Sequence, residues 1–303
     1  MLVSEEIRAA VAAGRPVVAL ETTIVTHGLP RPRNLEVARA AEDLLRRAGV
    51  VPATIGVVAG EPVVGLTGEQ LTHLASGERV EKLSVRDLPV AVARGVDGGT
   101  TVAATAWLAH RAGIRVFATG GLGGVHRGAS TTFDESADLV ALAGLPITVV
   151  SAGVKSILDV PATLERLETL NVTVLGYRTD AFPGFYVTDA GVPVPARVDA
   201  PAQAAAVIRA RDALGLSGAV LLANPVAAAA QLDAAEHRAV LDAALAAADA
   251  GGVTGHDTTP FLLDHVHRAT EGRSLEVNTA VYLGNTALAA DVAAALGAPA
   301  ART

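Results

Sequence analysis

Short apolar runs rich in β-branched residues alternate with helical patterns along most of the chain. Runs of this kind predict β-strands, and they lie at residues 16–23, 53–66, 115–120, 147–153, 173–177 and 218–225. The second run contains the break Ala-Gly-Glu-Pro, so it predicts two strands joined by a turn. The other runs are short enough to be single strands buried in a sheet.

Helical periodicity fills the intervals between these runs. It predicts helices at residues 34–49, 100–113 and 161–171. Asn34 is the expected N-cap of the first, Gly113 follows the end of the second, and Pro161 stands in the first turn of the third. Thr67 and Gln70 have the spacing of a capping box, which predicts another helix after residue 67.

The alternation predicts an α/β fold: a layered α/β/α arrangement with a mostly parallel central sheet covered by helices on both faces. Beyond about residue 233 the chain is rich in alanine and reads as helices, and residues 179–199 read as a long loop or small excursion. There is no internal repeat and no clear linker. We therefore expect residues 1–303 to form one domain.

The amino-acid composition narrows the class of protein further. Half of the residues are hydrophobic but only 3% are aromatic, so the core is expected to consist mainly of aliphatic side chains. The net charge of −7 argues against a nucleic-acid or anionic-membrane surface. The chain has no cysteine, lacks a signal-like N-terminus, and has no unbroken apolar run of roughly 18 residues. These features favour a soluble, cytoplasmic protein.

Lysine is nearly absent from this sequence. Of 24 basic residues only Lys82 and Lys155 are lysines, so arginine stands almost everywhere that a positive charge is sufficient. A lysine amine can lose its proton and attack a carbonyl, whereas a guanidinium stays charged. The two lysines are therefore candidates for chemistry that arginine cannot do, although chance composition is the simpler alternative.

Two reactive side chains follow predicted strands directly. Lys155 comes after Ser-Ala-Gly-Val at the end of an apolar run, where partial burial would favour the neutral amine that a Schiff base requires. Glu21 ends the first predicted strand, where burial favours the protonated form of a general acid. The alternatives are a lysine whose ammonium reaches water and a carboxylate that caps a helix or pairs with arginine.

A loop with five glycines spans residues 119–128 and allows backbone amides to approach a phosphate closely. It is not the dinucleotide fingerprint, because His126 occupies the position of the third glycine, and no Walker motif is present. His126 in this loop, together with Asp134, Glu135 and Asp138 just after it, suits a hard divalent cation. The alternative for these carboxylates is a helix N-terminus.

Weaker signals point to substrate contacts. Lys82 stands near Arg86 in an otherwise acidic chain, so the pair can neutralise a phosphate or simply be solvated. Asn278 and Asn285 lie near the start of the last predicted helix, where an amide can read the polar edge of a planar base or, at Asn278, cap the helix. Asn224 and the pair at 256–257 are similar but weaker.

Taken together, the motifs resemble a known family. The segments ALETTIVTHGLP, KLSVRDLP, GTTVAATAWLAHRAGIRVFATGGLGGVHRGASTTFDESADL, VSAGVKSILD, VLGYRTDAFPGFY, LLANP, TPFLL and VNTAVYLGN are similar, in the same order, to the pseudouridine 5′-phosphate glycosidase family, which is related to indigoidine synthase A-like proteins. The resemblance runs from about residue 15 to residue 296. It implies an α/β/α fold, a homotrimer, and a Mn²⁺-dependent enzyme that reversibly splits pseudouridine 5′-phosphate into uracil and ribose 5-phosphate.

The resemblance also implies roles for individual residues. Lys155 matches the nucleophile, Glu21 the general acid and base, and Asp134 the metal-associated carboxylate. The positions that match substrate contacts are Lys82, Thr101, Val102, His126, Ser136, Ala137, Asp138 and Asn278. Two other classes stay open: a Schiff-base aldolase acting on a sugar phosphate, and a sugar-phosphate-binding protein without catalysis.

Overall fold

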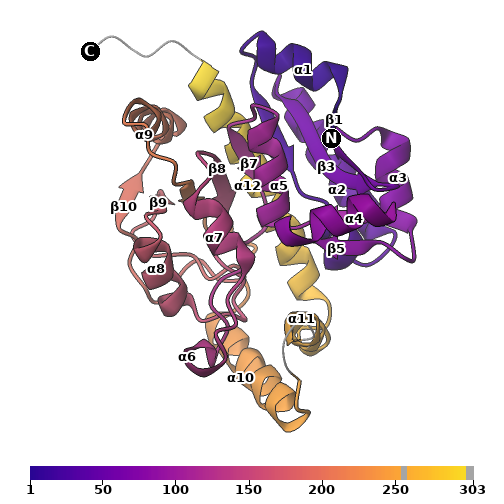
Figure 1. Cartoon of the computed structure of the whole chain (residues 1–303). Coiled ribbons are helices and arrows are strands. Elements are labelled where there is room, and N and C mark those ends of the chain that lie inside the picture. The colour runs from indigo at the N-terminus through magenta and orange to yellow at the C-terminus, as the bar shows by residue number, and fades with distance from the viewer. Residues whose placement is uncertain (254–257, 298–303) are drawn as a thin grey trace.

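The computed structural model describes residues 1–253 and 258–297, and within them the strands form one sheet of eleven (Figure 1). The strands are β1 (Leu2–Val3), β2 (Val17–Leu20), β3 (Val51–Val58), β4 (Glu61–Val64), β5 (Glu81–Leu83), β6 (Gly98–Thr100), β7 (Val116–Ala118), β8 (Thr148–Ser151), β9 (Thr173–Tyr177), β10 (Ala196–Val198) and β11 (Val220–Ala223).

The main path of the sheet runs β1-β4-β3-β2-β7-β8-β11-β9-β10, and the β5–β6 pair branches from β3. Every neighbouring pair from β3 to β10 along this path is parallel, while β4 and β6 are antiparallel to β3. The sheet is therefore mostly parallel, as predicted. The carboxyl ends of β2, β7, β8 and β11 meet at one edge, which is where sheets of this kind bind ligands.

Helices cover the sheet and extend beyond it (Figure 1). The α-helices are α1 (Glu5–Ala12), α2 (Arg33–Arg47), α3 (Gly68–Ser76), α4 (Leu88–Arg94), α5 (Val102–Arg111), α6 (Ala129–Thr132), α7 (Ala137–Ala143), α8 (Val160–Thr169), α9 (Pro201–Ala213), α10 (Ala234–Ala250), α11 (Thr258–Ala269) and α12 (Arg273–Gly297). A π-helical turn, η1 (Ile24–Gly28), follows β2, and a 3₁₀ turn, η2 (Val85–Asp87), precedes α4.

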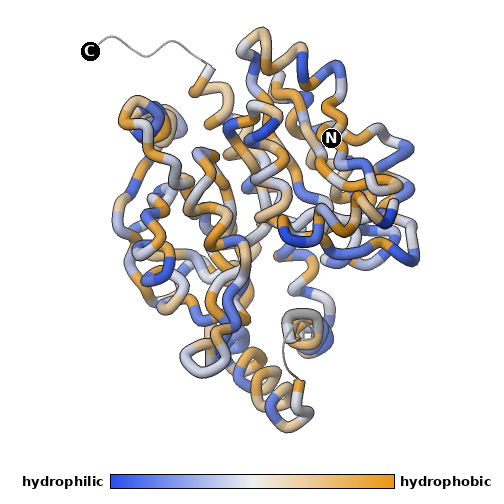
Figure 2. The backbone as a smooth tube through the Cα atoms, in the orientation of Figure 1, coloured by the Kyte–Doolittle hydropathy of each residue, from blue (hydrophilic) through white to orange (hydrophobic). Residues whose placement is uncertain are grey.

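Two hydrophobic clusters lie on opposite faces of the sheet. Successive strand side chains point to opposite faces, and β2 accordingly gives Val17 and Ala19 to one cluster and Val18 and Leu20 to the other. Residues of α1, α4, α5, α7 and α8 belong to the first cluster, and residues of α2, α3, α9 and α12 to the second. The central strands are predominantly hydrophobic in Figure 2. The prediction of helices on both faces is confirmed.

The last helix, α12, is long and apolar enough to cross a membrane by length and composition alone. Half of its most apolar window is buried, and it packs between α2 and α9 against β2, β7 and β8. A helix that is hydrophobic on most sides and covered by protein is a core helix. It is the central cover of the second face of the sheet.

The predicted strands all form, and the break in residues 53–66 is the turn at Ala59 and Gly60 between antiparallel β3 and β4. The capping box of Thr67 and Gln70 is confirmed, and so is Pro161 in the first turn of α8. Asn34 as an N-cap is wrong. Its buried amide lies inside α2 and donates from Nδ2 to the carbonyl oxygen of Val25 at 2.7 Å, which fixes η1 to the helix.

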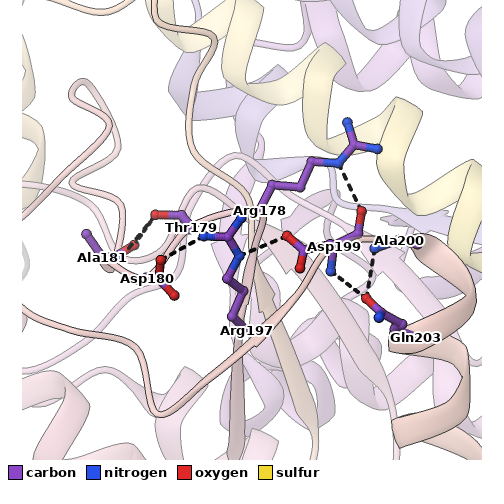
Figure 3. A network of polar contacts seen from close by, with 8 residues as sticks. All are labelled: Arg178, Thr179, Asp180, Ala181, Arg197, Asp199, Ala200 and Gln203. Atoms are coloured by element: carbon purple, nitrogen blue, oxygen red, sulfur yellow. Dashed lines mark hydrogen bonds and ion pairs between the residues drawn. The ribbon is translucent and has the colours of Figure 1, made fainter.

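The excursion at residues 179–199 is the long connection expected between two sheet elements, and β10 forms at its end. A polar network holds it to the sheet edge (Figure 3). Arg197 pairs with Asp180 at 2.7 Å and with Asp199 at 2.8 Å, and Gln203 Oε1 accepts a hydrogen bond from Asp199 N at 2.6 Å. These contacts join both ends of the excursion to the start of α9.

Candidate active site

The carboxyl edge of the sheet places the two strongest sequence candidates on neighbouring elements. Glu21 directly follows β2, and Lys155 lies in the loop after β8. The amide of Lys155 donates to the carbonyl oxygen of Leu122 at 3.1 Å, so the lysine loop runs beside the glycine-rich loop that follows β7. Because β7 separates β2 from β8 in the sheet, these loops converge.

Glu21 is a buried carboxyl at this edge, with 8% of its surface exposed. The hydroxyl of Thr119 donates a hydrogen bond to Glu21 Oε1. Burial raises the pKa of Glu21, and the positive charge of Lys155, the Thr119 hydrogen bond and the charge of Lys82 oppose that shift, while the charge of Asp138 adds to it. A carboxyl with a raised pKa can carry a proton, which is the property of a general acid.

The only two lysines of the chain act on one another electrostatically. Lys82 lies on β5, where it pairs with Gly99 of β6, and Lys155 is half-buried in its loop. Lys82 is an exposed residue, but desolvation of its ammonium by the atoms around it lowers its pKa, and the positive charge of Lys155 lowers it further. The two amines, far apart in the sequence, therefore both lie close enough to the buried Glu21 for their charges to act on it.

Asp138 organises the backbone of the glycine-rich loop. Its Oδ1 accepts from the amide of Ala103 at 2.9 Å and its Oδ2 from the amide of Gly123 at 2.8 Å. A Cβ on Gly123 would lie 2.2 Å from Ser136 Oγ, so only glycine fits there. Asp138, which the resemblance places at the substrate, thus uses both oxygens to join the loop to the start of α5.

The N-terminus of α5 faces the same edge. Thr101 is its N-cap, with Oγ1 accepting from the amide of Ala104 at 3.4 Å, and Val102 is its buried first residue. The first amides of a helix together with its dipole form a binding site for anions. Ser136 caps α7 in the same way and Ala137 begins that helix, so both lie beside the glycine-rich loop.

His126 and Asp134 lie across the tip of the glycine-rich loop from each other. The His126 amide donates to the Asp134 carbonyl oxygen at 3.0 Å, and the ring Nδ1 lies 3.9 Å from Asp134 Oδ2. Burial lowers the pKa of His126; the Asp134 charge opposes this shift. Glu135, a further candidate metal ligand, pairs instead with Arg166 at 2.8 Å.

Within the described residues, no group of three or more His, Asp or Glu side chains is arranged to hold a metal ion. This donor set does not fit a zinc site, which takes three or four protein ligands. It fits an ion such as Mg²⁺ or Mn²⁺, which is commonly held by one or two carboxylates together with water and substrate phosphate. The sequence resemblance assigns such a carboxylate to Asp134, whose side chain is 41% exposed.

Asn278 lies in the second turn of α12. The alternative prediction, that Asn278 is the N-cap of this helix, is therefore wrong. An added Cβ on Gly120 would lie 3.5 Å from Asn278 Oδ1 and 3.6 Å from the ring of Phe185, so both side chains border the end of β7. Phe185 is 4% exposed. Phe185 belongs to the segment VLGYRTDAFPGFY that carries the family resemblance, but nothing in its position along the sequence predicted that it lies beside the end of β7.

Asn285 does not face a ligand. Its Nδ2 donates to the carbonyl oxygens of Thr119 at 2.8 Å and Gly120 at 3.2 Å, and its Oδ1 accepts from Asn224 at 3.0 Å. Both asparagines are therefore used within the protein. The weaker candidate pair at 256–257 lies outside the described residues.

Fold and site together define a layered α/β protein with a half-buried lysine, a buried acid and a glycine-rich loop at one sheet edge. The family model described as indigoidine synthase A like protein matches residues 6–295. The chain belongs to this family, as the sequence motifs predicted.

The relatives carry a more specific name. Pseudouridine-5′-phosphate glycosidase of Saccharopolyspora erythraea is 66% identical over 295 residues, which cover 97% of each chain. That of Frankia alni is 57% identical over 298 residues, which cover 98% of this chain and 82% of the relative. The crystal structure of prealnumycin C-glycosynthase AlnA in complex with ribulose 5-phosphate superposes with a TM-score of 0.91 at 42% identity, covering 97% of this chain and 96% of that one.

Proposed function

We propose that the protein is a pseudouridine-5′-phosphate glycosidase, which reversibly cleaves the bond between ribose C1′ and uracil C5. The observation that carries the proposal is the meeting of Lys155 and the buried acid Glu21 at one sheet edge, in a chain 66% identical to an enzyme of that name. Relatives with this name and a structural neighbour that binds a pentulose phosphate support the same substrate class.

The bond to be broken explains why a lysine is needed. Carbon is a poor leaving group, so acid-assisted hydrolysis of the kind that releases a nitrogen-linked base would be slow. In the proposed reaction Glu21 gives its proton to the ribose ring oxygen as the bond from that oxygen to C1′ breaks, and the Lys155 amine bonds to C1′. Ring opening therefore makes C1′ available to the amine.

The second half of the reaction releases both products. A proton returned to C5 of uracil allows the C1′–C5 bond to break with its electron pair on uracil, which leaves an iminium between C1′ and Lys155. Water adds to the iminium, and ribose 5-phosphate departs as the free amine is restored. Glu21 is suited to move the protons because its raised pKa keeps the acid form accessible.

The 5′-phosphate is proposed to lie between Lys82, the N-terminus of α5 at Thr101 and Val102, and the residues that begin α7. Lys82→Met should raise the KM for pseudouridine 5′-phosphate by about 10–100-fold, because a charge-assisted contact to phosphate is lost. Steady-state kinetics measure this. Pseudouridine without phosphate is the control substrate: its kcat/KM should not change, and an equal loss on both substrates would contradict the assignment.

Mn²⁺ is the metal that the family resemblance implies, and Asp134 is the residue proposed to hold it, with His126 beside it. When bound, such an ion supplies a positive charge that orients water and phosphate. Asp134→Asn should weaken Mn²⁺ binding by roughly 10-fold or more, measured by calorimetric titration of the free protein. Glu135→Gln is the matched control, since its carboxylate is bound to Arg166, and equal losses in both variants would contradict the assignment.

We propose that the protein is a homotrimer in the cytoplasm. Its proposed partners are small molecules only: pseudouridine 5′-phosphate, uracil and ribose 5-phosphate.

The functional test is an assay of free uracil released from pseudouridine 5′-phosphate. Release of uracil supports the glycosidase. Cleavage only of carbon chains between hydroxyl and carbonyl carbons would support the alternative, a Schiff-base aldolase acting on a sugar phosphate.

A further inference from the structure

The residue in contact with the Glu21 carboxyl is Thr119, which directly follows β7. The register of β2 and β7 pairs Leu20 with Ala118, so Glu21 and Thr119 leave the sheet side by side. Thr119 is completely buried, and its hydroxyl donates to Glu21 Oε1. Its amide donates to the carbonyl oxygen of Val150 at 3.0 Å, which continues the pairing of β7 with β8.

A buried asparagine holds Thr119 from the other side of the sheet. Asn285 of α12 is 1% exposed, and its amide nitrogen binds the Thr119 carbonyl oxygen at 2.8 Å. Asn224, which follows β11, donates to the side-chain oxygen of Asn285 at 3.0 Å. A buried amide costs free energy unless its polar atoms are bonded. Here Asn285 donates to the carbonyl oxygens of Thr119 and Gly120 at the end of β7, and Asn224 satisfies the oxygen of Asn285.

We propose that Thr119 is a positioning residue that fixes the rotamer of the Glu21 carboxyl, and that Asn285 and Asn224 hold Thr119 for this purpose. The proposal rests on the proposed role of Glu21 as proton carrier. A threonine hydroxyl has one proton to donate, so its bond to Oε1 leaves Oε2 as the oxygen directed to the substrate. A fixed carboxyl matters because misplacement by about 1 Å can cost about 10²-fold in rate.

The same bond affects protonation. A hydroxyl that donates to a carboxylate favours the charged form, so it lowers the pKa of Glu21 against the larger effect of burial. The charged groups that act on Glu21 are Lys155, Lys82 and Asp138, and they stay in place when the hydroxyl is removed. Loss of the hydroxyl should therefore raise the pKa of Glu21 further.

The test compares Thr119→Val, which removes the hydroxyl, with Thr119→Ser, which keeps it. For the valine variant we expect kcat to fall about 10–100-fold with KM changed by less than about 3-fold. The limb of the pH–rate profile at which activity is lost as Glu21 deprotonates should move to higher pH. The serine variant should stay within about 3-fold of wild type in kcat and keep the wild-type limb.

A second measurement separates this inference from the proposed function. The carboxyl of Glu21 can be titrated by ¹³C NMR in wild type and in both variants, with Glu21→Gln to assign the signal, and this needs no substrate. A higher Glu21 pKa in Thr119→Val but not in Thr119→Ser supports the inference even if wild type releases no uracil. An unchanged pKa in the valine variant, or equal effects in both variants, would overturn it. If valine prevents folding, Thr119→Ala takes its place.

Discussion

Lys155→Ala is expected to abolish turnover of pseudouridine 5′-phosphate, by roughly 10⁴-fold or more, and to remain folded. The amine is the proposed nucleophile, and the second lysine is not expected to replace it because Lys82 lies on β5 and is assigned to the phosphate. The fold should survive because Lys155 is only half-buried and its backbone contact to Leu122 does not involve the side chain. Uracil release and the far-ultraviolet circular dichroism spectrum measure the two properties.

Lys155→Arg is the matched variant for this prediction. Arginine keeps the positive charge and most of the length, but a guanidinium cannot form the iminium. It should therefore be as inactive as the alanine variant. Activity within about 10-fold of wild type in the arginine variant would show that Lys155 acts only through its charge, which contradicts covalent catalysis.

Glu21→Gln has the second largest expected effect, a fall in kcat of roughly 10²–10⁴-fold, since a glutamine can neither give nor take the proton. Glu42→Gln is the matched control. Glu42 is also a partly buried carboxyl whose pKa is raised by burial, and it too accepts a hydrogen bond from a threonine, Thr54. It lies on α2, and no active-site lysine is among the charges that act on it.

The control should keep near-normal kcat. If both variants lost activity equally, burial of any carboxyl would explain the loss and Glu21 would have no special role. A small loss in Glu21→Gln alone would equally contradict its role as proton carrier. Steady-state release of uracil at saturating substrate distinguishes these results.

The raised pKa of Glu21 also makes the free energy of unfolding depend on pH. Because the native state holds this proton at higher pH than the unfolded chain, ionisation of Glu21 lowers the free energy of unfolding as pH rises from the ordinary value of 4.5 through the native one. Glutamine removes that loss. Compared with wild type, Glu21→Gln should therefore gain stability as pH rises through this range. A loss of activity of the variant at the upper end of the range would then not result from unfolding.

Much of the fold could be predicted because each buried parallel strand is a short apolar run, which the sequence makes visible. The strands that were missed, β1, β5, β6 and β10, have only two or three residues each and carry no such run. Asn34 was misread because an asparagine before an apolar pattern has the spacing of an N-cap. Its actual partners, Val25 and Ala75, could not be seen along the sequence.

The residues of the candidate site also differ in how far the sequence predicts them. The places of Glu21 after β2 and of Lys155 after β8 could be predicted, because the end of an apolar run is visible in the sequence itself. Thr119 could not, since a threonine after a strand is common and its role depends on the register that places it beside Glu21. The sequence also offers Asn285 as a side chain that reads a base. In the structure it bonds to Thr119, Gly120 and Asn224, and each of these partners lies more than 60 residues from Asn285 in the sequence.

The central claim is a covalent bond between ribose C1′ and Lys155, and reductive trapping tests it most directly. The protein is incubated with ribose 5-phosphate, reduced with borohydride, digested and mapped by mass spectrometry. Only two lysines are present, so the assignment is unambiguous. The account predicts that the reduced sugar phosphate is found on Lys155 and is lost in Lys155→Arg; an adduct on Lys82, or none on either lysine, would contradict it.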